Sequence, residues 1–467
     1  MKTPVRSRRR PAAVDTTPPS TPVLVRNWPA GEPPVSYRLV ATSALTPPDR
    51  QLKDHPDKHV AQIATSIGRF GFIAPIVVDA DLKIVTGVGR FLAAKLLGLD
   101  KVPVVQVDHL GQAELRTLAI ADNKLCELAP FNGEVLGLEF RDLSAMDLGY
   151  DLEITGFDGG TIDVLATPPL VTDDPPPPPL DPIDASVACE GDIFLLGDHR
   201  LICGNSLEEH TYRLVMGPDQ ARMVVSDSPY NVKIENNVSG LGEVRHRDFV
   251  MASGEMSREQ FTGFLTTVFR HLASFSVDGS IHYQFMDHRH LREMLDAGEA
   301  AYTELKNLCV WDKQVGAMGT CYRNQFELCF VWKSGQAPYI NNFRLGETGR
   351  YRTNLWSYPG MAALGPGKRE ELAMHPTCKN LQMICDMLLD VSRRGEVVLD
   401  PFSGAGTTII AGEKTGRRAR AIELDPAYVA VAIRRWEKLT GSTAVHAELG
   451  CTFDELIALR AGQEDAA

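Results

Sequence analysis

The sequence has no apolar run near the ~18 residues that a membrane helix requires. Its start, Met1 to Arg10, lacks the apolar core of a secretory signal peptide. The nine cysteines include no Cys-x-x-Cys pair, which argues against a zinc site or a disulfide framework and favours reduced thiols. We therefore expect a cytoplasmic protein with no membrane segment and no bound metal.

Basic residues are missing from one long stretch. Residues 151–198 contain eleven Asp or Glu and no Lys or Arg, so most of the net charge of −12 belongs to this segment. The remainder is close to neutral, and a local basic face for nucleic acid is therefore not excluded.

At 467 residues the chain is too long for one typical core, so several domains are expected. We predict a disordered tail over 1–35, a compact domain over 36–157 and an acidic Pro-rich linker over 158–188 that contains Pro175 to Pro179. A larger domain over 189–445 and a C-terminal tail over 446–467 complete this division.

A glycine turn follows an apolar run near the C-terminus. Asp400 ends the run, Gly404 and Gly406 lie in the turn, and a second apolar run ends at Glu423. The turn lacks the Lys of a phosphate-binding P-loop and the third Gly of a dinucleotide site, which argues against a polyphosphate ligand. Asp400 suits a cationic ligand, and the acid about twenty residues on can hold the hydroxyls of a ribose.

Two further motifs precede this turn. The apolar run Met223 to Ser226 leads into Asp227-Ser228-Pro229-Tyr230, and His375-Pro376-Thr377-Cys378-Lys379 follows later. In this order the set resembles the beta class of S-adenosylmethionine-dependent DNA amino-methyltransferases. The resemblance and the alternating strands and helices imply an α/β, Rossmann-like, mostly parallel sheet with helices on both faces.

The resemblance also implies roles for individual residues. The catalytic set is Asp227, Ser228, Pro229 and Tyr230. The cofactor pocket comprises Asp400, Phe402, Gly404, Gly406, Thr407, Glu423, His375, Thr377 and Lys379, the last three at the methionine end. The usual tetrapeptide is Asp-Pro-Pro-Tyr, so Ser228 is a departure. Asn205, where relatives usually carry Asp, is another.

The chemistry gives these residue types a reason. An exocyclic amine is a poor nucleophile because its lone pair is conjugated into the ring. Acceptors for both N–H groups, here the carboxylate of Asp227 and the carbonyl of Ser228, would free that lone pair. Tyr230 offers a flat face on which a base taken out of the duplex can stack. No cysteine nucleophile is needed.

Residues 36–157 resemble the small α+β ParB-like domain, shared with sulfiredoxin. The matching pieces are Ser66 to Ile76, Gly87-Val88-Gly89-Arg90 and Ala121 to Lys124. A glycine turn at a helix N-terminus beside an Arg can bind phosphate, so Gly87, Gly89 and Arg90 are candidate nucleotide ligands, with a purely structural turn as the alternative. The sulfiredoxin cysteine is missing, which argues against redox repair.

Basic and aromatic residues alternate over 313–369, which we interpret as a recognition region for double-stranded DNA. The candidate DNA contacts are Arg245, Arg247, Lys313, Arg323, Arg350 and Arg352. A solvated basic face over buried aromatic residues is the alternative. A homodimer and a nucleotide at the ParB-like domain are left open as partners.

The sequence therefore predicts a nucleoid-associated DNA methyltransferase of the restriction-modification type that acts on adenine N6, because the tetrapeptide begins with Asp. An N4-cytosine enzyme is the nearest alternative. A ParB-like DNA-binding regulator with a vestigial methylase is the alternative from another class, and Ser228 and Asn205 are its support.

Overall fold

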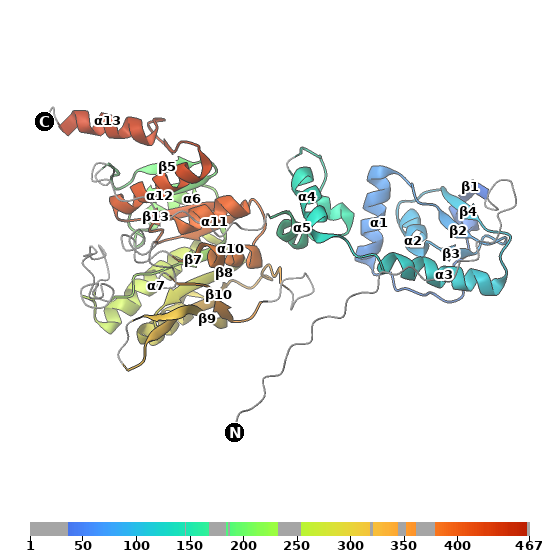
Figure 1. The fold of residues 1–467 in the computed structure, drawn as a ribbon, viewed down its shortest axis with the longest axis horizontal. Helices are drawn as coiled ribbons and strands as arrows, with labels where there is room; N and C mark the ends of the chain where they lie inside the picture. The colour runs from blue at the N-terminus through green and yellow to red at the C-terminus, as the bar shows by residue number, and fades with distance from the viewer. Residues whose placement is uncertain are drawn as a thin grey trace, which may run out of the picture. The chain divides into compact units, whose positions relative to one another are not determined.

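The computed structural model describes residues 36–144, 146–167, 184, 187–231, 254–317, 321–343, 352–360 and 379–464. The chain divides into two compact units, Met1–Pro130 and Phe131–Ala467, whose elements are labelled in Figure 1. Within the described ranges, no helix is long and apolar enough to cross a membrane.

The first unit is a small α+β domain. Its four strands lie in the order β1-β4-β2-β3, and their bounds are β1 Ser36–Ala41, β2 Ile76–Val78, β3 Ile84–Thr86 and β4 Lys101–Gln106. Its main helices are α1 Asp57–Phe70, α2 Val88–Leu96 and α3 Gln112–Glu127. Phe91 of α2 packs on Ile76 and Val104 of the strands in a small apolar core. The predicted α+β class of this domain is confirmed.

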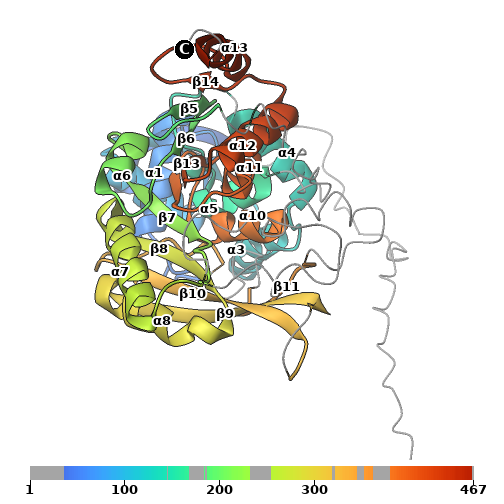
Figure 2. The same ribbon diagram turned by 90° about the vertical axis from the view of Figure 1, so that its left-hand side faces the viewer.

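The second unit contains a ten-stranded sheet in the order β11-β9-β10-β8-β7-β12-β13-β6-β5-β14. The strands are β5 Ile193–Leu196, β6 His199–Cys203, β7 Ala221–Ser226, β8 Ser276–Met286, β9 Glu304–Ala317, β10 Asn324–Ser334, β11 Leu355–Ser357, β12 Val397–Asp400, β13 Arg418–Glu423 and β14 Val445–His446. The central five, β8, β7, β12, β13 and β6, are parallel. Beside them β9 and β10 form a long antiparallel ribbon (Figure 2).

Helices cover both faces of this sheet. One face packs on α6 Glu209–Met216, α7 Arg258–Ser274 and α8 Leu291–Ala301. The other packs on α10 Leu381–Val391, α11 Thr407–Thr415, α12 Pro426–Thr440 and α13 Phe453–Glu464. The mostly parallel, doubly covered sheet predicted from the sequence is confirmed.

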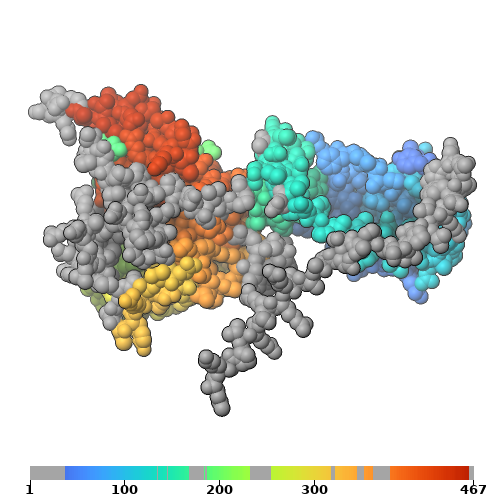
Figure 3. All heavy atoms as spheres, in the orientation of Figure 1, coloured from blue at the N-terminus to red at the C-terminus, as the bar shows by residue number. Residues whose placement is uncertain are grey.

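Helices α4 Gly133–Ser144 and α5 Gly159–Ala166 belong to the second unit, although the domain boundary expected at residue 157 separates them. They pack together through the buried Phe140 and Ile162. In the space-filling view the segment that carries them lies against the orange elements of the second unit (Figure 3). The structural division therefore comes earlier in the chain than the sequence suggested.

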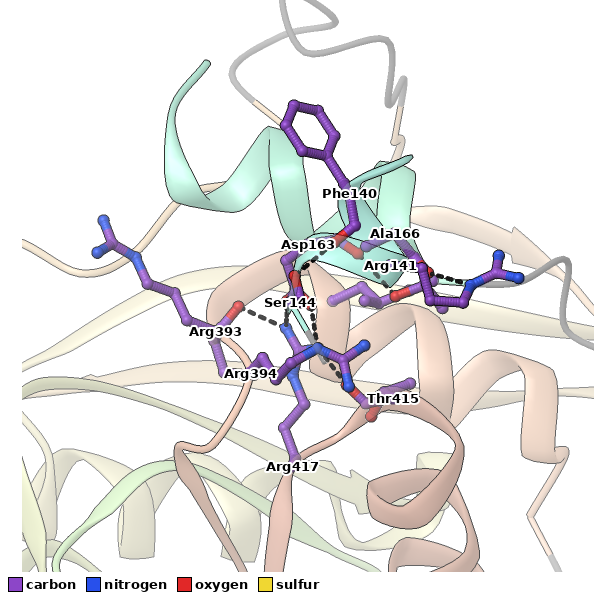
Figure 4. A network of polar contacts seen from close by, with 12 residues as sticks. Phe140, Arg141, Ser144, Asp163, Ala166, Arg393, Arg394, Thr415 and Arg417 are labelled. Carbon is purple, nitrogen blue, oxygen red and sulfur yellow. Dashed lines mark hydrogen bonds and ion pairs between the residues drawn. The ribbon is translucent and has the colours of Figure 1, made fainter. Parts of the chain in front are cut away.

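A buried ion pair attaches α5 to the sheet (Figure 4). The Asp163 carboxylate contacts the Arg417 guanidinium, and both side chains are almost fully buried. Arg417 also donates to the Ser392 hydroxyl at 3.0 Å and to the Thr415 carbonyl at 2.7 Å. Because a buried guanidinium needs a counter-charge, Asp163 holds α5 at the start of β13.

The end of the chain also differs from the expected tail over 446–467. It contains α13, and Phe453 and Leu456 of this helix are buried against the core of the second unit. The Phe453 ring packs edge-on against Phe194 of β5, with 5.7 Å between their centroids. The apolar spacing within Phe453 to Ile457 is the signal for this helix.

Candidate functional site

Three carboxylates gather at one edge of the sheet. Asp227 directly follows β7, Asp400 ends β12 and Glu423 ends β13, and these three strands are parallel neighbours. Carboxyl ends of parallel strands meet at the same sheet edge, which is where open α/β sheets bind ligands. The structure thus brings together the acids of the two motifs that lie far apart in the sequence.

Asp227 has both carboxylate oxygens engaged. The Lys379 ammonium lies 2.6 Å from Oδ2, and the Tyr230 hydroxyl donates to Oδ1 at 2.9 Å. Burial raises the pKa of Asp227, the nearby Glu327 raises it further, and Lys379 opposes both. Asp227 is therefore a hydrogen-bond acceptor in a site that is largely shielded from solvent.

Glu327 of β10 is a fourth carboxylate in this site, and the sequence analysis assigned it no role. It lies 2.8 Å from the Lys379 ammonium and 2.5 Å from the Lys313 ammonium. It also contacts the Tyr230 hydroxyl, whose single proton is shared between Asp227 and Glu327. Although burial acts in the opposite direction, the two lysines lower the pKa of Glu327 to about 2. A lone acid in the apolar strand Phe326 to Trp332 was the signal for it, since a buried carboxylate requires partners.

Lys379 was predicted at the methionine end of a cofactor pocket. The structure shows its ammonium between Asp227 and Glu327, and 5.6 Å from the centroid of the Tyr230 ring. Burial favours the neutral amine, but the two carboxylates raise the pKa of Lys379 overall. The companion predictions His375 and Thr377 lie outside the described residues.

The glycine turn is built around Asp400. Its carboxylate accepts the Phe402 N–H at 3.0 Å and the Thr408 hydroxyl at 2.6 Å. Burial raises the pKa of Asp400 to about 7, although these two bonds act against the shift. Phe402 packs on the α7 side of the sheet, with its ring centroid 6.1 Å from that of Phe264.

Gly404 and Gly406 serve different purposes in the turn. Both have positive φ, 51° and 77°. A Cβ at Gly404 would have no atom within 4 Å, whereas one at Gly406 would lie 2.8 Å from the Cβ of Ala432. Gly406 is therefore required by packing against α12, and Gly404 leaves open space beside the backbone that a ligand can approach.

Two side chains from outside the turn fix it in place. Glu423 accepts the Gly404 N–H at 2.7 Å, and burial raises the pKa of Glu423 to about 7. From α12, the buried guanidinium of Arg435 donates to the Ala405 carbonyl at 3.0 Å and to the Thr407 hydroxyl at 3.1 Å. Arg435 was missed, because its helical position reads as an ordinary surface residue.

The residues around the tetrapeptide are also tightly held. Ser228 is 1% exposed, and its hydroxyl lies 3.3 Å from that of Ser226. After Pro229 and Tyr230, the Asn231 side chain accepts the N–H groups of Gly254 and Met256 and donates to the Met256 carbonyl at 2.9 Å. Asn231 therefore joins the two ends of the intervening segment.

The predicted DNA contacts fall into three groups. Lys313 pairs with Glu327, and Arg352 donates to Asp390 at 3.0 Å and to the Tyr358 hydroxyl at 2.6 Å, so both cations already have partners. Arg323 is exposed. The remaining three lie outside the described residues: Arg245, Arg247 and Arg350.

The candidate nucleotide ligands of the first unit lie at the start of α2. Gly87 is the N-cap with φ 95°, and a Cβ on it would lie 3.0 Å from the Arg90 guanidinium. Gly89 is buried, and a Cβ there would lie 2.9 Å from the Ile63 side chain. Gly89 is thus needed for packing, while Gly87 and Arg90 lie at the helix N-terminus as predicted.

No group of three or more His, Cys, Asp or Glu side chains suited to a metal ion occurs in the part of the chain that the structure describes. Asn205, the second departure from the family pattern, accepts the Leu207 N–H through its side-chain oxygen at 2.9 Å.

Three family models match the chain. The ParB N-terminal domain matches residues 35–124, the ParB-methyltransferase HTH domain 134–188 and the DNA methylase family N6_N4 221–434. The second match covers α4 and α5, which the sequence analysis had placed partly in the first domain and partly in a linker.

Individual relatives match separate parts of the chain. The type II methyltransferase M2.MboI of Moraxella bovis is 29% identical over 115 residues, which are 24% of this chain and 41% of that protein. DNA adenine methyltransferase YhdJ of Escherichia coli is 33% identical over 82 residues, 18% of this chain and 26% of that protein. The matched segments thus span less than half of either methyltransferase.

The E. coli ParB-like nuclease domain-containing protein YnaK is 36% identical over 66 residues, 14% of this chain and 76% of that protein. The chain therefore belongs to the ParB-like family through its first domain, and it joins this ParB N-terminal domain to a DNA methylase domain of the N6_N4 family.

Proposed function

We propose that the chain is a DNA methyltransferase that transfers a methyl group from S-adenosylmethionine to the N6 amine of adenine in double-stranded DNA. The observation that carries the proposal is the position of Asp227 and Asp400 at the ends of two neighbouring parallel strands, β7 and β12. The match to the N6_N4 DNA methylase family over 221–434 supports it.

The residues of the glycine turn fit this cofactor. The open space beside Gly404 admits a ligand close to the backbone, and Glu423 at the end of β13 presents a carboxylate to ribose hydroxyls. Asp400 offers negative charge to a cationic methionine end. The cofactor supplies a methyl group activated on a sulfonium.

The chain's own residues would prepare the amine. Asp227 accepts one N–H of the base, and the Ser228 carbonyl, directed by the following Pro229, accepts the other. The lone pair is then freed from conjugation. Tyr230, whose hydroxyl is fixed by Asp227 and Glu327, holds the extruded base by stacking. The tetrapeptide would thus supply both acceptors and the stacking surface.

The test is methyl transfer in vitro. Purified protein is incubated with methyl-labelled S-adenosylmethionine and duplex DNA, and the DNA is then digested to nucleosides. We expect label in N6-methyl-2′-deoxyadenosine with the wild type and with Asp147→Ala, an exposed acid of the same unit, but not with Asp227→Ala.

Two other results would contradict the proposal, one its target base and the other its reaction. Label in N4-methyl-2′-deoxycytidine would overturn adenine as the target and leave the methyl-transfer reaction in place. Absence of label, together with no cofactor binding by calorimetry, would overturn the methyltransferase and favour the ParB-like DNA-binding regulator. Two departures from the family pattern, Ser228 and Asn205, support that second function.

A further inference from the structure

Four charged side chains form a closed cluster next to the proposed methyl-transfer site. Asp227 and Glu327 supply two negative charges, and Lys313 and Lys379 supply two positive ones. Lys379 touches both acids, at 2.6 Å and 2.8 Å, whereas Lys313 touches Glu327 at 2.5 Å. The cluster is thus electrically balanced as it stands.

The negative charge of Glu327 is what makes the cluster neutral. Its side chain is 6% exposed, so solvent screens its charge little. Without this charge, Lys379 would have Asp227 as its single carboxylate partner in the cluster. The cluster would then carry a net positive charge beside the glycine turn. Asp227 and Lys379 both influence the pKa of Asp400, so this charge would be felt at the turn.

We infer that Glu327 is a positioning residue. Its negative charge offsets the positive charges of Lys379 and Lys313, so that Asp227 can accept a hydrogen bond from the target amine and the site can admit a sulfonium cation. This inference rests on the proposed function and deepens it. Glu327 also contacts the Tyr230 hydroxyl, which shares its proton with Asp227, and this contact restrains the ring on which the base would stack.

The charge is tested with two ligands of nearly the same shape. S-adenosylmethionine carries the sulfonium charge, and its demethylated thioether, S-adenosylhomocysteine, does not. Calorimetry on the full chain measures both dissociation constants without DNA or turnover. We expect Glu327→Gln to weaken the binding of the sulfonium ligand relative to that of the thioether by roughly three- to tenfold, because one poorly screened negative charge near the cation is removed.

A double variant separates charge from structure. Glu327→Gln combined with Lys313→Gln removes one charge of each sign, and we expect it to restore the ratio of the two dissociation constants towards the wild-type value. Glu304→Gln is the matched control, since it removes the same charge from an exposed ion pair with Lys306 on β9. It should leave the ratio unchanged.

If Glu327→Gln weakens the binding of both ligands by the same factor, the role of Glu327 is merely structural and the inference is overturned. It is also overturned if Glu327→Gln changes neither dissociation constant, or if the double variant does not restore the ratio. These results leave the methyltransferase proposal intact, provided that the wild type binds S-adenosylmethionine and transfers label. Failure of the wild type in those two assays would instead overturn the proposed function itself.

Discussion

The Glu423 carboxylate accepts the backbone N–H of Gly404 at 2.7 Å, so the acid that ends β13 is tied to the turn that follows β12. A ligand whose hydroxyls bond to Glu423 must share this carboxylate with the turn or displace the turn from it. The strength of such binding depends on the ionisation of Glu423, because the ionised form is the better acceptor.

Cofactor binding should therefore tighten as pH rises through about 7, where the raised pKa values of Asp400 and Glu423 lie. Both groups are protonated below this pH in the ligand-free protein, and a cation and ribose hydroxyls favour the ionised forms. Calorimetry between pH 6 and 8, in buffers of different ionisation enthalpy, should show proton release. Glu423→Gln should reduce the pH dependence of the dissociation constant. A dissociation constant of the wild type that does not change between pH 6 and 8 would contradict the prediction.

Stability of the ligand-free protein should change in the opposite direction. The pKa of Glu423 is higher in the folded protein than the ordinary value of 4.5. Glu423 therefore makes its full contribution to the free energy of unfolding below pH 4.5. This contribution is lost as pH rises through about 7. Urea unfolding from pH 5 to 8 should give a free energy of unfolding that falls less steeply in Glu423→Gln than in the wild type.

Gly406→Ala should destabilise the second unit by about 1–3 kcal/mol, because it adds a clash to the strain of a positive φ. The new Cβ would lie 2.8 Å from Ala432. Gly441→Ala is a matched control, since Gly441 has φ 70° and a Cβ added to it would meet no atom within 4 Å. Equal losses in urea unfolding would show that packing against α12 is not the reason for Gly406.

Asp163→Asn should destabilise the second unit by about 3–5 kcal/mol, because it leaves the Arg417 guanidinium buried without its counter-charge. The measurement is unfolding of the full chain, monitored by hydrogen exchange in α5 and β13. Asp147→Asn, an exposed acid between α4 and α5, should change little. A small effect of Asp163→Asn would mean that the hydrogen bonds to Ser392 and Thr415 suffice.

Arg323 and Arg352 should behave differently in DNA binding. Arg323→Gln should weaken binding across all sequences and reduce the salt slope by about 1, if the exposed guanidinium contacts phosphate. Arg352→Gln should leave the slope unchanged and lower stability, since Arg352 is bonded to Asp390 and Tyr358. A changed slope for Arg352→Gln would show that this arginine exchanges partners on DNA.

Much of the larger domain could be predicted from the sequence, because its motifs combine local signals. Apolar runs that end in Asp227, Asp400 and Glu423 indicated strands, and parallel pairing then places the acids at one edge. Residues whose role depends on tertiary contact were not found. Glu327 and Arg435 act across the sheet or from a helix, and no spacing in the sequence relates them to Tyr230 or to Thr407.

The acidic region illustrates the opposite error. Its lack of Lys and Arg and its run of prolines suggested a linker from residue 158 onwards, yet α5 occupies Gly159–Ala166. The Asp163 carboxylate meets its cation more than two hundred residues later, at Arg417. Composition reports the charge of a segment and does not report the partner that neutralises it.

The hydrogen bonds of Asn231 have a consequence for the tetrapeptide. Its side-chain amide bonds Gly254 and Met256, so residues more than twenty positions apart in the sequence are joined directly after Tyr230. Helix α7 begins two residues after Met256. The tetrapeptide is therefore anchored to β7 on its N-terminal side and to the start of α7 on its C-terminal side.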